Sequence, residues 1–131
     1  MTTSSTVTAE SAARALTHIC HRAARAAGWW VDAKTGESIT SNPYCFSNKL
    51  MLTVSELAEA MEGDRKSLMD DKLPHLPMRD VELADALIRI FDLAGAYDID
   101  LGAAVAQKLA FNAHRPDHKL ANRVLAGGKA Y

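Results

Sequence analysis

The sequence predicts an all-α protein, because four stretches carry apolar residues at helical spacing and glycine or proline residues separate them. The first stretch follows Thr8, a favourable N-cap residue, and stops at Gly28, a residue common just past helix ends. The residues expected to form its apolar face are Leu16, Ile19, Ala23 and Ala27. Three further helices complete the predicted set.

These helices are expected over about residues 46–68, 80–97 and 100–114. Pro74 and Pro77 enforce a break between the first two, Asp100 is the expected N-cap of the last, and Pro116 follows its end. Residues 29–44 have weak hydrophobic periodicity, and this pattern predicts a long, ordered loop. The tail is expected to add a short helix before two glycines. The residues expected in the core are Leu50, Val54, Leu57 and Met61 of the second helix and Ala84, Leu87, Ile88 and Phe91 of the third.

Length and composition restrict the class of protein. The 131 residues fit a single helical domain, residues 1–131, with a flexible leader of about residues 1–7 and a tail of about 120–131. A formal net charge of −1 argues against binding to nucleic acid. No apolar run approaches the length that spans a bilayer, so we expect no membrane partner. Cys20 and Cys45 form no metal-binding or disulfide pattern, which favours a cytoplasmic location.

Two pairs of acidic residues are the main candidates for chemistry. Glu56 and Glu59 are spaced i, i+3 on the second helix, and Glu82 and Asp85 have the same spacing on the third. At this spacing both carboxylates of a pair leave one side of their helix, so packing the helices can gather four acids. Such a cluster suits a hard divalent cation such as Mg²⁺. The same spacing is also typical of a solvated helix surface, so the pairs alone leave both interpretations open.

The residues around these pairs favour the first interpretation. The segments that matter are Leu52-Thr-Val-Ser-Glu-Leu-Ala-Glu-Ala-Met-Glu62, Val81-Glu-Leu-Ala-Asp-Ala-Leu-Ile-Arg-Ile-Phe-Asp-Leu-Ala94 and Lys108-Leu-Ala-Phe-Asn-Ala-His-Arg-Pro116. Over roughly residues 46–119 the chain resembles the MazG-like, all-α nucleoside triphosphate pyrophosphohydrolases. Their signature is E-x-x-E, a variable spacer and E-x-x-D, here with a K-x-x-x-N-x-x-R run downstream.

The resemblance implies a four- to five-helix bundle of this type that forms a homodimer or homotetramer. It implies hydrolysis of a nucleoside triphosphate to the monophosphate and pyrophosphate with Mg²⁺, for which Mn²⁺ can substitute. By position it makes Glu56, Glu59, Glu82 and Asp85 the catalytic metal ligands. Acidic residues can face a triphosphate only through bridging cations, which is consistent with this assignment.

Other residues are candidates for contact with the substrate. The resemblance assigns phosphate and sugar contacts to Lys108, Asn112 and Arg115, expected on one face of the fourth helix. Asn48 and Lys49 are further candidates. Of the two tryptophans, core or interface packing is the favoured role for each, and Trp30 is the preferred candidate if one stacks on the base. Asp92, seven residues after Asp85, is expected to bind an additional metal or to form an ion pair with Arg89 or a lysine.

One position departs from the family pattern. Some relatives carry a glutamate that acts as general base immediately before the first motif glutamate, whereas this chain has Ser55. We therefore expect the proton of the attacking water to pass to a motif carboxylate, such as Glu59, or the water to be activated mainly by metal.

Several alternative functions stay open at this stage. Within the same class, a base-specific dUTP or dCTP hydrolase or a phosphoribosyl-ATP hydrolase fits the metal motifs equally well. A di-iron carboxylate protein is disfavoured, because no histidine follows a motif acid at i+3. A non-catalytic helical interaction module requires only that the acids form a solvated surface.

Overall fold

The computed structural model describes residues 6–131, and these residues form helices joined by turns and loops, without a β-strand. The expected leader, residues 1–7, therefore lies mostly outside the described residues. The elements are α1 (Ala9–Ala26), η1 (Ile39–Ser41), α2 (Cys45–Lys66), α3 (Met78–Ala96), α4 (Leu101–His114), η2 (Pro116–His118) and α5 (Leu120–Arg123). The all-α class is thus confirmed. None of the described helices is long and apolar enough to cross a membrane.

The chain divides into two compact units, and each is considered separately. One unit comprises Ala15–Ile99 and contains α2, α3 and most of α1. The other combines the chain up to Arg14 with Asp100–Tyr131, and it contains α4 and α5. The expectation of a single domain stays a prediction.

Local sequence explains where α1 begins and ends. The Thr8 hydroxyl accepts a hydrogen bond from the Ser11 backbone N–H at 3.1 Å, and the Ser11 hydroxyl accepts one from the Thr8 N–H at 3.0 Å. These reciprocal bonds satisfy N–H groups that a helix start leaves unpaired. Gly28 has φ +82°, a conformation that favours glycine, and it lies just past the end of the helix. The predicted cap and stop are both confirmed.

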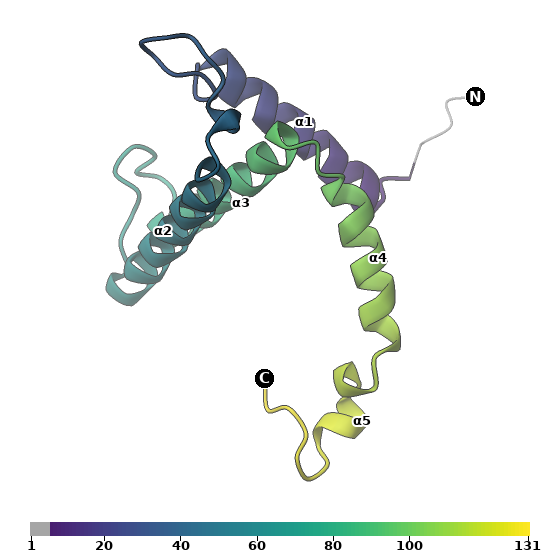
Figure 1. The fold of residues 1–131 in the computed structure, drawn as a ribbon. Coiled ribbons are helices and arrows are strands. Elements are labelled where there is room, and N and C mark those ends of the chain that lie inside the picture. Colours follow the sequence, from purple (N-terminus) through teal and green to yellow (C-terminus); the bar gives the residue numbers. More distant parts are fainter. Residues whose placement is uncertain (1–5) are drawn as a thin grey trace, which may run out of the picture. The chain divides into compact units, whose positions relative to one another are not determined.

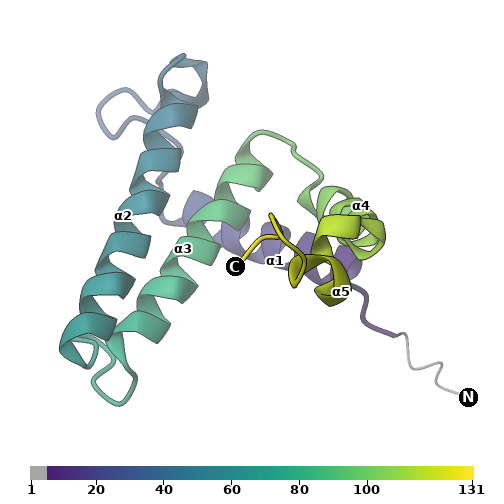
Figure 2. The ribbon, with the colours of Figure 1, turned by 90° about the horizontal axis from the view of Figure 1, so that it is seen from below.

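Helices α2 and α3 form an antiparallel hairpin, and both ribbon views show them side by side (Figures 1 and 2). The loop between them is folded around Asp70, which is buried and accepts hydrogen bonds from the N–H groups of Lys72 at 2.9 Å and Leu73 at 2.6 Å. Near this end of the hairpin, a Cβ added at Gly63 would lie 2.9 Å from the Met78 side chain, so glycine allows the close approach.

The faces buried in this hairpin are not the ones expected. Helix α2 buries Thr53, Glu56, Ala60 and Gly63, and α3 buries Glu82, Ala86, Leu93 and Ala94. The expected core residues of α2 are exposed, as Leu57 at 47% and Met61 at 57% illustrate. On α3, Leu87 and Ile88 are exposed as well. The predicted core faces were therefore wrong within this chain, because the hairpin closes along the acidic side of each helix and leaves most residues of both apolar stripes exposed.

The expected apolar face of α1 is also exposed, at Leu16 and Ile19. The neighbouring stripe is buried instead, and Cys20 is part of it. The core of the larger unit lies at the open end of the hairpin, where Trp30, Cys45 and Leu93 are buried against Tyr97 and other partly buried residues. The ring of Tyr97 meets those of Trp30 and Phe46 edge to face. This core fixes the loop after α1 against the hairpin.

In the smaller unit, Asp100 caps α4 by accepting from the Ala103 N–H at 3.0 Å, as expected. The same carboxylate accepts two hydrogen bonds from the Arg14 guanidinium, at 3.0 and 2.6 Å. Arg14 thereby lowers the pKa of Asp100 to about 2. Past α4, a short tail helix is present as predicted, and Asp117 is held by both Arg115 and Lys129.

Candidate metal centre and adjoining cavity

Three of the four motif carboxylates meet between α2 and α3. Glu56, Glu59 and Glu82 each offer an oxygen, and these oxygens all lie within 4.8 Å of one another. Glu56 and Glu82 are each 8% exposed, whereas Glu59 is exposed. The i, i+3 spacing gathers the two α2 acids on the side that faces α3. The cluster is therefore buried on one side and open at Glu59.

The cluster is electrostatically unfavourable without a cation. Burial, a hydrogen bond with Glu56 and repulsion from Glu59 and other nearby carboxylates raise the pKa of Glu82 to about 7. Burial and the charge of Glu56 also raise the pKa of Asp85, although Arg89 and Lys72 act in the opposite direction. A proton held near neutral pH is the response expected of acids crowded together with too little positive charge. A divalent cation would supply that charge.

Stability of the metal-free protein should accordingly decrease with rising pH. Between its ordinary pKa of 4.5 and the folded-state value of about 7, Glu82 keeps a proton that the unfolded chain has released. Because the folded state then binds more protons, the free energy of unfolding falls as pH rises through this window. Urea unfolding in a chelator, repeated at several pH values, measures the slope. Glu82→Gln should reduce it, and an equal slope in the variant would contradict the assignment.

The fourth motif acid, Asp85, is not part of the mutually close group. It lies one turn beyond Glu82 on α3, is partly buried, and lines the adjoining cavity. Also on α3, Arg89 donates from Nε to Glu56 Oε1 at 2.6 Å. This ion pair orients the Glu56 carboxylate and compensates part of its charge. The acids of α3 are thus divided, since Glu82 belongs to the cluster whereas Asp85 and Asp92 line the cavity.

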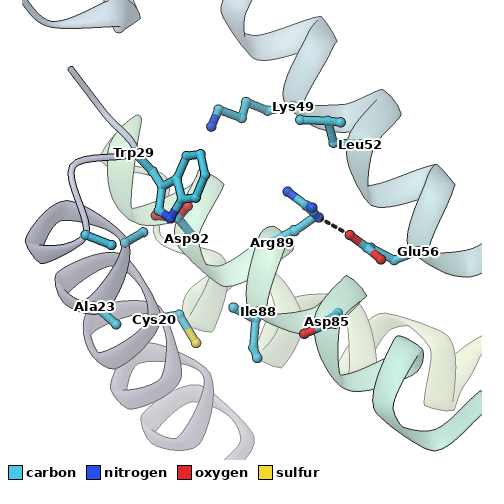
Figure 3. A pocket seen from close by; sticks show the side chains of 12 residues that line it. Cys20, Ala23, Trp29, Lys49, Leu52, Glu56, Asp85, Ile88, Arg89 and Asp92 are labelled. Atoms are coloured by element: carbon cyan, nitrogen blue, oxygen red, sulfur yellow. Dashed lines mark hydrogen bonds and ion pairs between the residues drawn. The ribbon is translucent and has the colours of Figure 1, made fainter. Parts of the chain in front are cut away.

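A cavity of about 570 Å³ is lined in part by Glu56, a member of the cluster, and by Asp85 (Figure 3). It is lined by α1, the following loop, α2 and α3, and Glu56 and Asp85 belong to both cavity and candidate metal centre. The lining residues are Cys20, Ala23, Ala24, Ala27, Trp29, Lys49, Leu52, Glu56, Asp85, Ile88, Arg89 and Asp92. One wall is made of small and apolar side chains and the other is charged, as expected of a pocket for a small polar ligand.

The two tryptophans have different roles in this structure. Trp30 is 6% exposed, packs in the core and donates from Nε1 to Asp92 Oδ1 at 2.8 Å. Trp29 is 68% exposed and lines the cavity. The tryptophan that lines the cavity is thus Trp29 and not the preferred candidate Trp30, whose expected core packing is present. Stacking on a base stays a prediction. The sequence could not indicate which of the two tryptophans lines the cavity, because adjacent residues in a loop without periodicity are equivalent in pattern.

Of the two candidates at the start of α2, only Lys49 reaches this region. Lys49 lines the cavity, and its Nζ lies 4.6 Å from the centre of the Trp30 ring. Asn48 is exposed and is not among the lining residues. Lys49 therefore supplies positive charge at the cavity wall, where a phosphate or sugar oxygen can be bound.

The K-x-x-x-N-x-x-R run belongs to the other unit. Lys108 and Asn112 lie on α4, and the buried side-chain oxygen of Asn112 has no hydrogen-bond partner within residues 6–131. Arg115 is not on the helix face as predicted, because it is the C-cap of α4 with extended backbone, and Pro116 follows. Its guanidinium binds Asp117 at 2.9 and 2.5 Å. The assignment of these residues to the substrate stays a prediction.

The cluster offers carboxylate oxygens and no nitrogen or sulfur ligand, which is the donor set that Mg²⁺ and Mn²⁺ prefer. At position 55, where some relatives carry a general base, the Ser55 hydroxyl donates to the Leu52 backbone carbonyl at 2.6 Å. Exposed Glu59 is the member of the cluster best placed to accept a proton from solvent. The residues present therefore fit a hard divalent cation, with no separate base at position 55.

Fold and site together define a class: an all-helical protein in which a helix hairpin encloses a carboxylate cluster beside a cavity. No protein-family model, curated protein or solved structure matches this chain. Support for a particular function therefore comes from the geometry of the site and from the motifs of the sequence.

Proposed function

We propose that this protein is a metal-dependent nucleoside triphosphate pyrophosphohydrolase that releases a nucleoside monophosphate and pyrophosphate. The observation that carries the proposal is the convergence of Glu56, Glu59 and Glu82 to within 4.8 Å at the edge of a 570 Å³ cavity. Burying like charges together is costly unless a cation compensates them. Placing such a centre beside a pocket whose lining includes Lys49, Arg89 and Trp29 matches a ligand that combines phosphates with a base.

Each group of side chains has a distinct role in this proposal. Glu56, Glu59 and Glu82 hold the cation, with Asp85 as a further ligand at the cavity side. When bound, Mg²⁺ or Mn²⁺ supplies positive charge for the phosphates and lowers the pKa of a bound water. Arg89 keeps Glu56 oriented, and Lys49 offers a charge-assisted hydrogen bond to an anionic oxygen. Glu59 is the candidate acceptor for the proton of the attacking water.

The other candidate functions receive less support from the site. A di-iron protein requires histidine ligands beside the carboxylates, whereas the cluster consists of glutamates. A non-catalytic module gives no reason to bury Glu56 and Glu82 together against repulsion. A base-specific hydrolase of the same class is compatible with every contact described, and it differs only in what the cavity accepts.

The decisive experiment is a panel of ribo- and deoxyribonucleoside triphosphates incubated with purified protein and Mg²⁺. Pyrophosphate and orthophosphate are detected separately for each nucleotide. We expect pyrophosphate from at least one nucleotide and dependence on the metal. Orthophosphate as the primary product would exclude the proposed bond, and no turnover of any nucleotide would exclude the proposed function.

We also propose that a second copy of the chain covers the outward apolar stripes of the hairpin. The residues that the second copy would cover are Leu50, Val54, Leu57 and Met61 on α2 and Leu83, Leu87 and Ile90 on α3, all of them exposed. Apolar residues repeated along one side of two packed helices are typical of a face buried in an oligomer. Their helical spacing supports this, because it is the spacing of a core face.

Leu57→Glu is therefore expected to shift the protein from dimer or tetramer to monomer, since it places a charge in the centre of the apolar contact. Sedimentation velocity at micromolar concentration measures the change. Leu73→Glu is the matched control, because Leu73 is 45% exposed in the loop of the same unit and lies off both stripes. A monomeric wild type, or equal dissociation by both variants, would contradict this arrangement.

A further inference from the structure

Asp92 has no role in the hydrolysis proposed above. Its Oδ1 accepts two hydrogen bonds, from Trp30 Nε1 at 2.8 Å and from His21 Nδ1 at 2.9 Å. The side chain is 13% exposed and lines the cavity. Among the described residues Oδ2 has no hydrogen-bond partner. Asp92 is thus a rigidly held carboxylate with one oxygen committed to the core and the other available to a ligand.

The surroundings keep this carboxylate fixed. His21 belongs to α1 and Trp30 to the loop, so Asp92 on α3 joins three segments of the unit. A Cβ at Gly95 would lie 2.5 Å from that of His21, so α1 and α3 approach closely only because residue 95 is glycine. A hydrogen-bonding group fixed by such partners discriminates between ligands better than a mobile one.

The distance from Asp85, the proposed further metal ligand at the cavity side, fits a nucleotide. Asp92 is seven residues, or about 10 Å along the helix, beyond Asp85. This length is comparable to the reach from an α-phosphate to the far edge of its base. Trp29 lines the same cavity, as do small α1 side chains such as Ala23 (Figure 3). A planar base can therefore pack in the cavity while its phosphates are near the cluster.

We infer that Asp92 is a specificity-determining residue that selects bases with an exocyclic amino group at this position, namely cytosine and adenine. This inference rests on the proposed function and names the substrate class for the same site. An ionised carboxylate is an acceptor only, so it pairs with an amino group such as N4 of cytosine. In uracil the corresponding position is a carbonyl oxygen, which would face Oδ2 with lone pairs on both sides. Asp92 therefore discriminates cytosine from uracil, because uracil lacks an exocyclic amino donor at this position.

Nucleoside binding tests this inference without metal, phosphate or turnover. The chain has two tryptophans, so ¹⁵N-labelled protein gives two indole N–H signals, and their shifts report binding at the cavity. The matched probes are cytidine against uridine and adenosine against inosine, which differ by an amino group and a carbonyl. We expect the amino member of each pair to bind about tenfold more tightly.

Asp92→Asn sharpens the test because asparagine can keep an oxygen toward Trp30 and His21 while presenting its NH₂ to the cavity. The variant should reverse the preference, so that uridine binds more tightly than cytidine. Asp98→Asn is the matched control, since Asp98 is exposed, does not line the cavity, and has φ +51°, which asparagine tolerates. It should keep the wild-type preference.

Equal binding of both members of each pair by the wild type would overturn the inference, even if a variant failed to fold. So would a wild-type preference retained in folded Asp92→Asn. The proposed function fails separately: nucleoside discrimination without triphosphate hydrolysis would leave Asp92 as a base-selecting residue of a binding protein. Hydrolysis with no base discrimination would remove only the role of Asp92.

Discussion

Glu82→Gln is expected to lower metal-dependent nucleotide hydrolysis by more than the roughly 10–100-fold that loss of an outer partner of a metal ligand costs. Glu82 is buried at the centre of the cluster, within 4.8 Å of the other two glutamates. Glutamine keeps the size of the side chain and one oxygen but removes the negative charge. The remaining cluster should bind Mg²⁺ too weakly to position the phosphates.

The same substitution is expected to stabilise the metal-free protein. At pH 8 Glu82 is ionised against its neighbours, and removing the charge removes that repulsion. Lower activity with a higher melting temperature separates loss of a ligand from loss of the fold. Steady-state hydrolysis and thermal unfolding in a chelator measure the two effects.

Glu62→Gln is the matched control for this variant. Glu62 lies on α2, where it pairs at the surface with Arg65 and Lys66, and it is outside the cluster. Its activity should stay near that of the wild type. Full activity in Glu82→Gln, or a similar loss of activity in Glu62→Gln, would contradict a role of the carboxylate cluster in catalysis. Glu59→Ala and Asp85→Ala should likewise lose activity while keeping their helicity.

Trp29→Ala is expected to raise the KM for the preferred nucleotide about tenfold and to change kcat little. Stacking of a base on an aromatic side chain contributes about 1–3 kcal/mol, and the contact is made equally in ground and transition states. Trp29 is 68% exposed and lines the cavity, so its loss costs little packing. Initial rates over a range of nucleotide concentrations separate the two constants.

Tyr44→Ala serves as the control, because Tyr44 is 76% exposed in the same unit but does not line the cavity. It should keep the wild-type KM. An unchanged KM in Trp29→Ala would show that the base does not stack on this residue. A large fall in kcat alone would instead place Trp29 near the reacting phosphates.

The helices could be predicted closely because their signals are local. The caps Thr8 and Asp100 were identified from residue type, and the ends of α2, α3 and α4 agree with the expected ranges within two residues. The acid pairs were also recognisable, since i, i+3 spacing fixes which side of a helix they share. Three of the four acids meet in the structure.

The orientation of the hairpin was not predictable in the same way. A stripe such as Leu50, Val54 and Leu57 indicates a buried face, but periodicity does not tell whether the chain itself or another molecule covers it. The ion pair of Arg89 with Glu56 and the bonds of Asp92 join segments far apart in sequence. Such partners depend on tertiary packing, which no local pattern encodes.

The central claim is that the carboxylate cluster supports cleavage between the α and β phosphates. A ³¹P NMR time course of nucleoside triphosphate with wild-type protein and Mg²⁺ tests it most directly, with Glu82→Gln in parallel. We expect signals of monophosphate and pyrophosphate to grow together, to require the metal and to be absent in the variant. Diphosphate and orthophosphate, or metal-independent turnover, would contradict the claim.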